Sequence, residues 1–177
     1  MMTLARPRTD QQLATGAGVQ VVLLAALSAE VGLGPVGWLV GIAYTLVLST
    51  LLAAAIRRAR ADTLGPADLV TLARAVLVGG VTALVVDRLF SGSTDVVATP
   101  VVATLVVTAT VALVLDAVDG QVARRSGTAS ALGARFDMEV DAFLILVLSV
   151  HVAVLVGPWA LAIGAMRYGF VAASWMM

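Results

Sequence analysis

The sequence predicts an all-α fold: a polytopic integral membrane helical bundle of about six transmembrane helices. The first observation is composition, because 60% of the 177 residues are hydrophobic and only 12% are charged, whereas an ordinary soluble domain has roughly 25% charged residues. The second is pattern, because the apolar residues form long runs without alternation at period two. Backbone polar groups in lipid must be hydrogen bonded within their own segment, so each run is expected to be a helix.

Six apolar runs approach the length of about 20 residues that crosses roughly 30 Å of hydrocarbon. The runs are 13–29, 36–56, 69–86, 96–118, 140–156 and 159–177. The first has no convincing cleavage site and more spans follow it, which favours a retained anchor over a signal peptide. Gly32, Gly34 and Pro35 break the chain between the first two runs, and Gly157 with Pro158 breaks it between the last two.

The arginines predict the orientation, since short cytoplasmic loops are enriched in basic residues. Arginines precede the first run, follow the second, and lie between the fourth and the fifth, at positions 6, 8, 57, 58, 60, 124, 125 and 135. The opposite connections carry Glu30, then Asp87, Arg88 and Asp95. The amino terminus and the segment between the fourth and fifth runs are therefore expected in the cytoplasm.

Charge and cysteine content exclude several function classes. The formal net charge is zero and the basic clusters flank apolar runs, so nucleic acid is not an expected partner. The chain has no cysteine, which rules out a disulfide framework, a thiolate nucleophile and a cysteine-ligated zinc.

Four aspartates border the polar segment between the fourth and fifth runs: Asp116, Asp119, Asp137 and Asp141. Spacings of i, i+3 and i, i+4 put each pair on one helical face. The intervening segment is short enough for the fifth span to return antiparallel beside the fourth, which would bring the two faces together. Four uncompensated carboxylates would repel one another, so we expect divalent cations between them.

Oxygen ligands without His or Cys favour magnesium or manganese, and four carboxylates neutralise two such ions. Two metals about 3.5 to 4 Å apart stabilise the attacking and leaving oxygens of a displacement at phosphorus. Gly120, Ala123 and Gly133 would leave room for a diphosphate or a base, and Arg124 offers a fork of donors to phosphate oxygens. Any single aspartate could be an interfacial or helix-start acid, but the complete set points to phosphoryl-type transfer.

The complete pattern resembles the signature of the CDP-alcohol phosphotransferase family. It reads Asp116-x2-Asp119-Gly120-x2-Ala123-Arg124-x8-Gly133-x3-Asp137-x3-Asp141. All the fixed positions of the signature are matched. A weaker match precedes it, since Asp68, Thr71 and Arg74 occupy the positions of an Asn-x2-Thr-x2-Arg segment that opens the family's first core helix, with Asp in place of Asn.

The resemblance implies an enzyme of phospholipid biosynthesis in the bacterial inner membrane, with its active site facing the cytoplasm. Such an enzyme transfers a phosphatidyl or similar group from a CDP-linked donor, most often CDP-diacylglycerol, to an alcohol hydroxyl and releases CMP. The resemblance makes Asp116, Asp119 and Asp137 ligands of two Mg²⁺ or Mn²⁺ ions. Asp141 would contact metal and help to deprotonate the acceptor. The CDP pocket would be lined by Gly120, Ala123, Arg124 and Gly133.

The resemblance also implies a division of the chain. Residues 1–66 would form a cytoplasmic tail and two additional transmembrane helices, and residues 67–177 would form the catalytic core. The family core usually has six helices, of which the last four runs would supply the first four. We therefore expect a truncated chain, or a partner that supplies the two missing core helices.

Other residues carry weaker expectations. Arg167 lies in the middle of the last run, where a charge usually faces a cavity or partner, here the acidic cluster or a phosphate. Arg74 could snorkel to the cytoplasmic surface.

His151 lies too far along its helix from Asp141 to share its metals and is expected to be packed. Gly79 and Gly80 permit close helix packing and are a weak indication of a homodimer.

Two alternative functions stay open on the sequence alone. A divalent-cation transporter would also place acids around metal, but it predicts them near the bilayer midplane and gives the glycine, alanine and arginine of the pattern no role. A non-catalytic membrane subunit or fragment would fit the abrupt end of the chain inside an apolar run.

Overall fold

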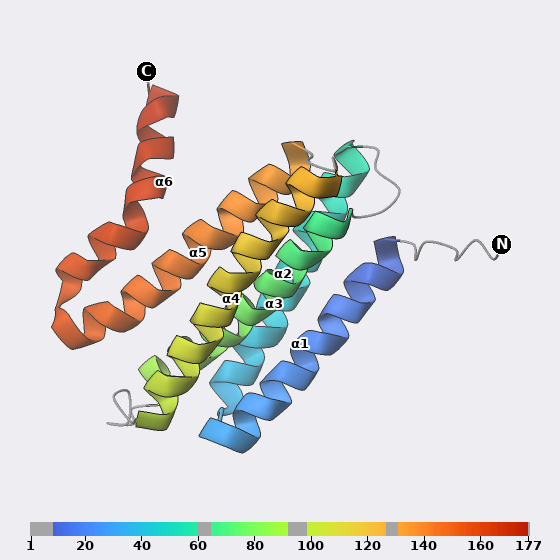
Figure 1. Cartoon of the computed structure of the whole chain (residues 1–177). Helices are drawn as coiled ribbons and strands as arrows, with labels where there is room; N and C mark the ends of the chain where they lie inside the picture. Colours follow the sequence, from blue (N-terminus) through green and yellow to red (C-terminus); the bar gives the residue numbers. More distant parts are fainter. Residues whose placement is uncertain (1–8, 60–64, 92–98, 127–130, 177) are drawn as a thin grey trace.

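The computed structural model describes residues 9–59, 65–91, 99–126 and 131–176, and these residues are almost entirely helical, with no strand among them. The elements are α1 (Thr9–Val31), α2 (Pro35–Ala59), α3 (Pro66–Phe90), α4 (Thr99–Ser126), α5 (Ala131–Val156), the 3₁₀ turn η2 (Pro158–Ala160) and α6 (Leu161–Met176). They form an elongated bundle from which α6 turns away (Figure 1). The predicted all-α class is confirmed.

Five of the described helices, α1 to α5, are long and apolar enough to cross a membrane. Large hydrophobic side chains on their outer faces are exposed, including Leu39 at 70% and Leu51 at 65%. Apolar faces of this extent are unfavourable in water and are satisfied by lipid. The chain is therefore an integral membrane protein built as a helical bundle.

The helix at the sixth predicted span is shorter than the apolar run 159–177 suggests. Gly157 adopts a positive φ of 107°, and Pro158 to Ala160 then form the 3₁₀ turn, so α6 starts only at Leu161. The helix has 16 residues, fewer than the roughly 20 that span a bilayer. Among the described helices, five rather than six have the length of a span.

Helix α3 is the centre of the bundle. Of its most apolar segment, 72% is buried inside the protein, against 17 to 33% for the other four long helices. It packs against α1, α2, α4 and α5. Its start is well defined, because Pro66 occupies the first turn and the Asp68 carboxylate accepts a 3.0 Å hydrogen bond from the Gly65 N–H.

The glycine pair of α3 allows this close packing. A Cβ at Gly79 would lie 2.7 Å from Gln20 of α1 and from the ring of Tyr44 of α2, and a Cβ at Gly80 would lie 2.7 Å from Leu23. Both glycines therefore face neighbouring helices of the same chain. The sequence-based link between this pair and a homodimer is not supported.

The end of α3 holds the connection between α1 and α2. The buried Asp87 carboxylate accepts hydrogen bonds from the N–H groups of Gly34 and Gly37, at 3.0 and 2.9 Å, at the amino end of α2. Next to it, Arg88 donates to the carbonyl oxygen of Val31 at the carboxyl end of α1. An acid at a helix start and a base at a helix end both complement the helix dipoles. Asp87 and Arg88, predicted to lie in a connection, are thus helical and structural.

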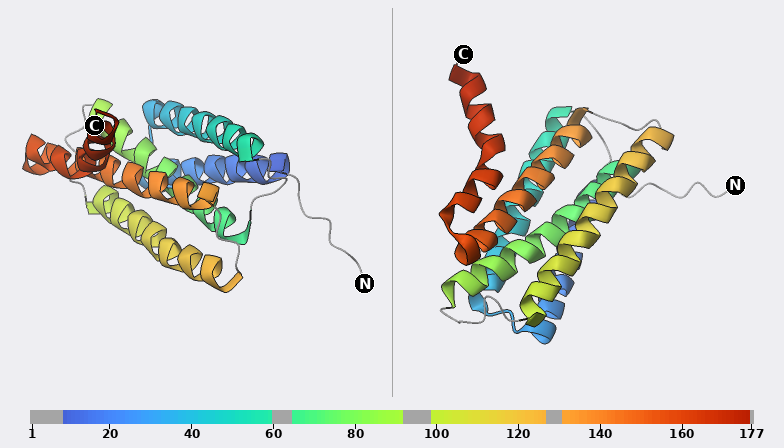
Figure 2. Two further views of the ribbon diagram at one scale, coloured as in Figure 1. Left: turned by 90° about the horizontal axis from the view of Figure 1, so that it is seen from above. Right: turned by 60° about the vertical axis from the view of Figure 1, so that its left-hand side comes forward.

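Helices α4 and α5 differ from the prediction in length and in neighbours. The fourth run was expected to end at residue 118 and the fifth to start at 140, but α4 continues to Ser126 and α5 starts at Ala131. Helix α4 packs mainly on α3, and α5 packs on both α3 and α6, while the described residues of α4 and α5 scarcely contact each other. The right-hand view of Figure 2 shows α3 running between them. The predicted side-by-side pairing is therefore wrong, because α3 lies between the two helices.

Candidate metal and phosphate site

Three of the four predicted aspartates meet at one end of the bundle. Asp116 comes from α4, and Asp137 and Asp141 come from successive turns of α5. Each offers a carboxylate oxygen, and the three oxygens lie within 4.8 Å of one another. The side chains are 40%, 32% and 39% exposed, so the cluster is open to solvent on one side.

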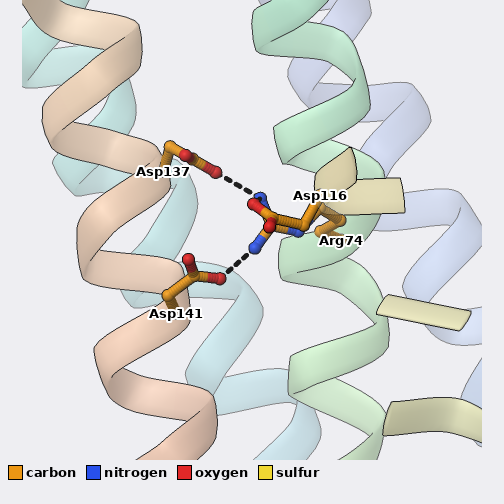
Figure 3. Close-up of polar contacts among 4 residues, drawn as sticks. All are labelled: Arg74, Asp116, Asp137 and Asp141. Atoms are coloured by element: carbon orange, nitrogen blue, oxygen red, sulfur yellow. Dashed lines mark hydrogen bonds and ion pairs between the residues drawn. The ribbon is translucent and has the colours of Figure 1, made fainter. Parts of the chain in front are cut away.

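Arg74 of α3 lies in the middle of this cluster (Figure 3). Its Nη1 is 2.9 Å from the Asp116 Oδ1, and the same nitrogen donates to Asp137 while Nη2 donates to Asp141. The Arg74 side chain is only 1% exposed. The expectation that it could snorkel to the surface is wrong, because three carboxylates compensate its charge inside the protein.

Arg74 is therefore the site residue that the sequence reading left out of the acidic cluster. Two signals could have found it: an arginine about two turns into an apolar helix is expensive without an acidic partner, and it closes the Thr71-x2-Arg74 pattern. Neither signal places its guanidinium among these three particular carboxylates. That placement depends on α3 lying between α4 and α5.

The remaining predicted residues are placed by their helices only. Asp119, Gly120, Ala123 and Arg124 lie on the last turns of α4, but their side chains are outside the described part of the structure, as is that of Arg167. Helical geometry puts Asp119 about one turn beyond Asp116, on the same face. Gly133 is half-buried in the first turn of α5, one turn before Asp137.

A small cavity opens beside the cluster, between α5 and α6. Its volume is about 240 Å³. Its lining is apolar apart from one carboxylate and consists of Met138, Asp141, Ala142, Ile145, Ile163 and Gly164. Gly164 lets α6 approach closely, because a Cβ there would lie 2.7 Å from the Leu146 backbone. Asp141 thus belongs both to the acidic cluster and to the wall of this cavity.

Two other polar residues of α5 are separate from the cluster. Glu139 is exposed and lies between Asp137 and Asp141 in the sequence. His151 is buried, with 7% of its surface exposed, and lies about 15 Å along the helix from Asp141 at 1.5 Å per residue. It is a packed histidine, as expected.

The donor set fits a divalent metal ion. The ligand atoms that converge are carboxylate oxygens only, and no His or Cys belongs to the cluster in the described part of the chain. Hard oxygen ligands of this kind suit Mg²⁺ or Mn²⁺. Each oxygen is within reach of a common point between the helices, so three ligands from α4 and α5 could bind one ion together.

Comparison with known families identifies the carboxyl-terminal part of the chain. The family model for CDP-alcohol phosphatidyltransferase matches residues 64–177, which include α3 to α6 and the whole acidic cluster. No curated protein and no solved structure matches the chain.

Proposed function

The chain belongs to the CDP-alcohol phosphatidyltransferase family, and on this premise we propose that it transfers a phosphatidyl group from CDP-diacylglycerol to an alcohol hydroxyl with release of CMP. Membership makes the protein a membrane transferase of substituted phosphate groups that acts in lipid synthesis. The observation that carries the proposal is the convergence of Asp116, Asp137 and Asp141 at one end of the spanning helices.

Four aspartates hold the metal in this proposal: Asp116 and Asp119 from α4, and Asp137 and Asp141 from α5. Bound Mg²⁺ or Mn²⁺, two ions when all four aspartates contribute, would screen the negative charge of the diphosphate and of the oxygens that enter and leave. The Asp116, Asp137 and Asp141 carboxylates come from helices that pack on the buried helix α3, so they are positioned before the substrate binds.

Asp141 has a second role, as acceptor of the proton from the attacking alcohol. Its carboxylate is 39% exposed and forms part of the cavity wall, where an acceptor hydroxyl can reach it. The alcohol oxygen forms a new bond to the phosphorus of the phosphatidyl group, and the bond from that phosphorus to the bridging oxygen breaks. The hydroxyl proton passes to Asp141, and CMP leaves with the bridging oxygen.

The cytidine diphosphate would lie along the last turns of α4 and the first turn of α5. Gly120, Ala123 and Gly133 present little side-chain bulk, so a nucleotide can approach the backbone there. Arg124 would pair with phosphate oxygens through its planar fork of donors. Gly120 directly follows Asp119, and the other three residues lie about one turn of helix from Asp119 or Asp137.

The position of the cluster suits a donor whose acyl chains stay in the bilayer. Asp116 is near the end of the apolar span Pro100–Val118, and Asp137 is near the start of the span Gly133–Val156. A diphosphate at this level is close to the lipid headgroups. With the arginine-rich connections on the same side, the active site and the amino terminus face the cytoplasm of a bacterial inner membrane.

We further propose that residues 67–177 form the catalytic core and that residues 1–66 support it. Helices α1 and α2 both pack on α3, and Asp87 and Arg88 of α3 cap the ends of those two helices. The additional helices thereby fix the position of α3. In this arrangement they stabilise the core without contributing to the acidic cluster.

The proposal is tested by measuring CMP release from CDP-diacylglycerol. Purified protein in detergent is incubated with Mg²⁺ or Mn²⁺ and a panel of alcohols that includes glycerol phosphate, inositol phosphate, serine and phosphatidylglycerol. We expect one alcohol to stimulate CMP release and chelation to stop it. Failure of every alcohol to stimulate release, in protein that binds CDP-diacylglycerol, would contradict the transfer reaction.

A further inference from the structure

The guanidinium of Arg74 occupies the position that a cation would take between α4 and α5. In Figure 3 it points from α3 into the group of carboxylates, with Asp137 and Asp141 on one side and Asp116 beside it. Nearly all of its surface is buried. It is paired with one oxygen of each of the three aspartates that converge on a common point.

A divalent ion and this guanidinium compete for the same carboxylates. Mg²⁺ requires carboxylate oxygens at about 2.0 to 2.1 Å in a nearly ideal octahedral arrangement. The Nη1 atom already lies within hydrogen-bonding distance of both Asp116 and Asp137. An ion held between these two carboxylates would lie close to a positively charged nitrogen, and electrostatic repulsion makes that arrangement unfavourable.

We propose that Arg74 is a resident counter-charge: it holds the three carboxylates together in the metal-free protein, and it must leave them for a divalent ion to bind. This inference rests on the metal site of the proposed function. Arg74 is a positioning residue in this scheme. It keeps the site assembled before the metal arrives and lowers the affinity for the metal by competing with it.

The charges of the cluster support this role. Three carboxylates carry three negative charges, and Arg74 supplies one positive charge, so the described cluster keeps an excess of negative charge that attracts a cation. Without Arg74 the three acids would repel one another in a partly buried position, at a large cost to the folded protein. The arginine therefore stabilises the empty site, while an incoming divalent ion offers a larger charge to the same oxygens.

The exchange requires only a movement of the Arg74 side chain. Its helix is fixed by contacts with α1, α2, α4 and α5, and the backbone at the next residue is held by the 2.9 Å hydrogen bond from the Tyr44 hydroxyl to the Ala75 carbonyl. The long arginine side chain can rotate towards the near, cytoplasmic end of α3, since the cluster is open to solvent on one side.

The test is the affinity for Mn²⁺, measured by electron paramagnetic resonance of the free ion with purified protein in detergent and no nucleotide. Arg74→Gln removes the charge but keeps a polar side chain. We expect it to bind Mn²⁺ at least about tenfold more tightly than the wild type, a factor equivalent to about 1.4 kcal/mol. An affinity equal to or weaker than that of the wild type would overturn the inference.

Arg88→Gln is the matched control, since Arg88 lies on the same helix but at the opposite end, where it caps α1. We expect this variant to bind Mn²⁺ as the wild type does. If both variants bound Mn²⁺ more tightly to the same extent, a general loosening of α3 would explain the change and the inference would fail. If neither the wild type nor Arg74→Gln bound Mn²⁺, the result would contradict both this inference and the metal site of the proposed function.

A measurement on the wild type covers the case in which Arg74→Gln does not fold. Phenylglyoxal modifies accessible guanidinium groups, and mass spectrometry locates the modified residue. We expect Arg74 to be protected in the metal-free protein and modified after Mn²⁺ is added. Unchanged or reduced modification in Mn²⁺ would overturn the inference. If the wild type also bound Mn²⁺ and transferred the phosphatidyl group, the proposed function would still stand.

Discussion

Asp141 is the residue at which the acidic cluster and the cavity meet. It pairs with Arg74 on one side and lines the space between α5 and α6 on the other. This double position separates it from Asp137, which belongs to the cluster but does not line the cavity. The difference predicts that the two residues contribute to different steps.

Replacing Asp141 by Asn should abolish transfer but leave nucleotide binding measurable. An amide cannot accept the proton of the alcohol, and loss of a general base typically lowers the rate by about 10² to 10⁴-fold. CMP release and CDP binding are measured on the same preparation. Glu139→Gln is the control, because Glu139 is exposed on the same helix outside the cluster. Full turnover by Asp141→Asn would exclude Asp141 as the base.

At this scale the sequence predicted that Asp116, Asp137 and Asp141 lie close together, but it did not predict that Arg74 pairs with them. The aspartates were recognisable because their spacing puts them on helical faces, which is a local property. The pairing of Arg74 with Asp116, Asp137 and Asp141 joins residues far apart in the chain. Such a pairing depends on which helix lies between which others, and the local spacing of residues does not show that arrangement.

Among the elements, α3 determines how closely the other helices approach. Its glycine at position 79 faces Gln20 and Tyr44, whereas Gly18 of α1 has no atom within 4 Å of a Cβ built on it. These two helical glycines therefore differ in packing while they share the same intrinsic helix propensity. Comparing alanine variants at the two positions therefore separates the effect of close helix packing on stability from the effect of helix propensity.

Gly79→Ala should destabilise the protein by about 1 to 3 kcal/mol, because the added methyl group overlaps α1 and α2. Gly18→Ala should leave stability unchanged or raise it by up to about 1 kcal/mol, because alanine favours the helix. Thermal unfolding in detergent measures both. Equal stability of the two variants would show that α3 does not depend on close packing at this position.

The existence of the long helices was predictable, but their ends and neighbours were not. Apolar runs mark the part of a helix inside the bilayer, and α4 and α5 continue beyond it through polar residues such as Gln121 and Arg135. A polar helical turn in water has no hydropathy signal that distinguishes it from a loop. The 3₁₀ turn at Pro158 likewise shortened α6 in a way that hydropathy does not register.

For the whole molecule, the orientation in the membrane decides which pool of substrates the site can use. The end of α4 and the start of α5, which carry the acidic cluster, lie at the end of the bundle where α1 starts (Figure 1). Asp87, near the end of α3, holds the connection from α1 to α2 at the other end. Residues Gln11 and Glu30 are both exposed near opposite ends of α1. They are separated by about 28 Å at 1.5 Å per residue, close to the hydrocarbon thickness.

Single cysteines at these two positions should report the orientation, since the natural chain has none. In intact spheroplasts a membrane-impermeant maleimide should label Glu30→Cys. It should label Gln11→Cys only after the membrane is permeabilised, because the arginine-rich side is expected in the cytoplasm. The reverse labelling pattern would place the acidic cluster on the outer side and contradict use of a cytoplasmic CDP-linked donor.

The most direct measurement is the affinity for CDP, determined by calorimetry with Mn²⁺ and again with chelator, for the wild type and for Asp137→Asn. If the carboxylates hold a cation that binds the diphosphate, the wild type will bind CDP only with Mn²⁺. Asp137→Asn will then bind it at least about tenfold more weakly, because one of the carboxylates that hold the ion is removed. Equal CDP affinity with and without metal, and in both proteins, would contradict a metal site at Asp116, Asp137 and Asp141.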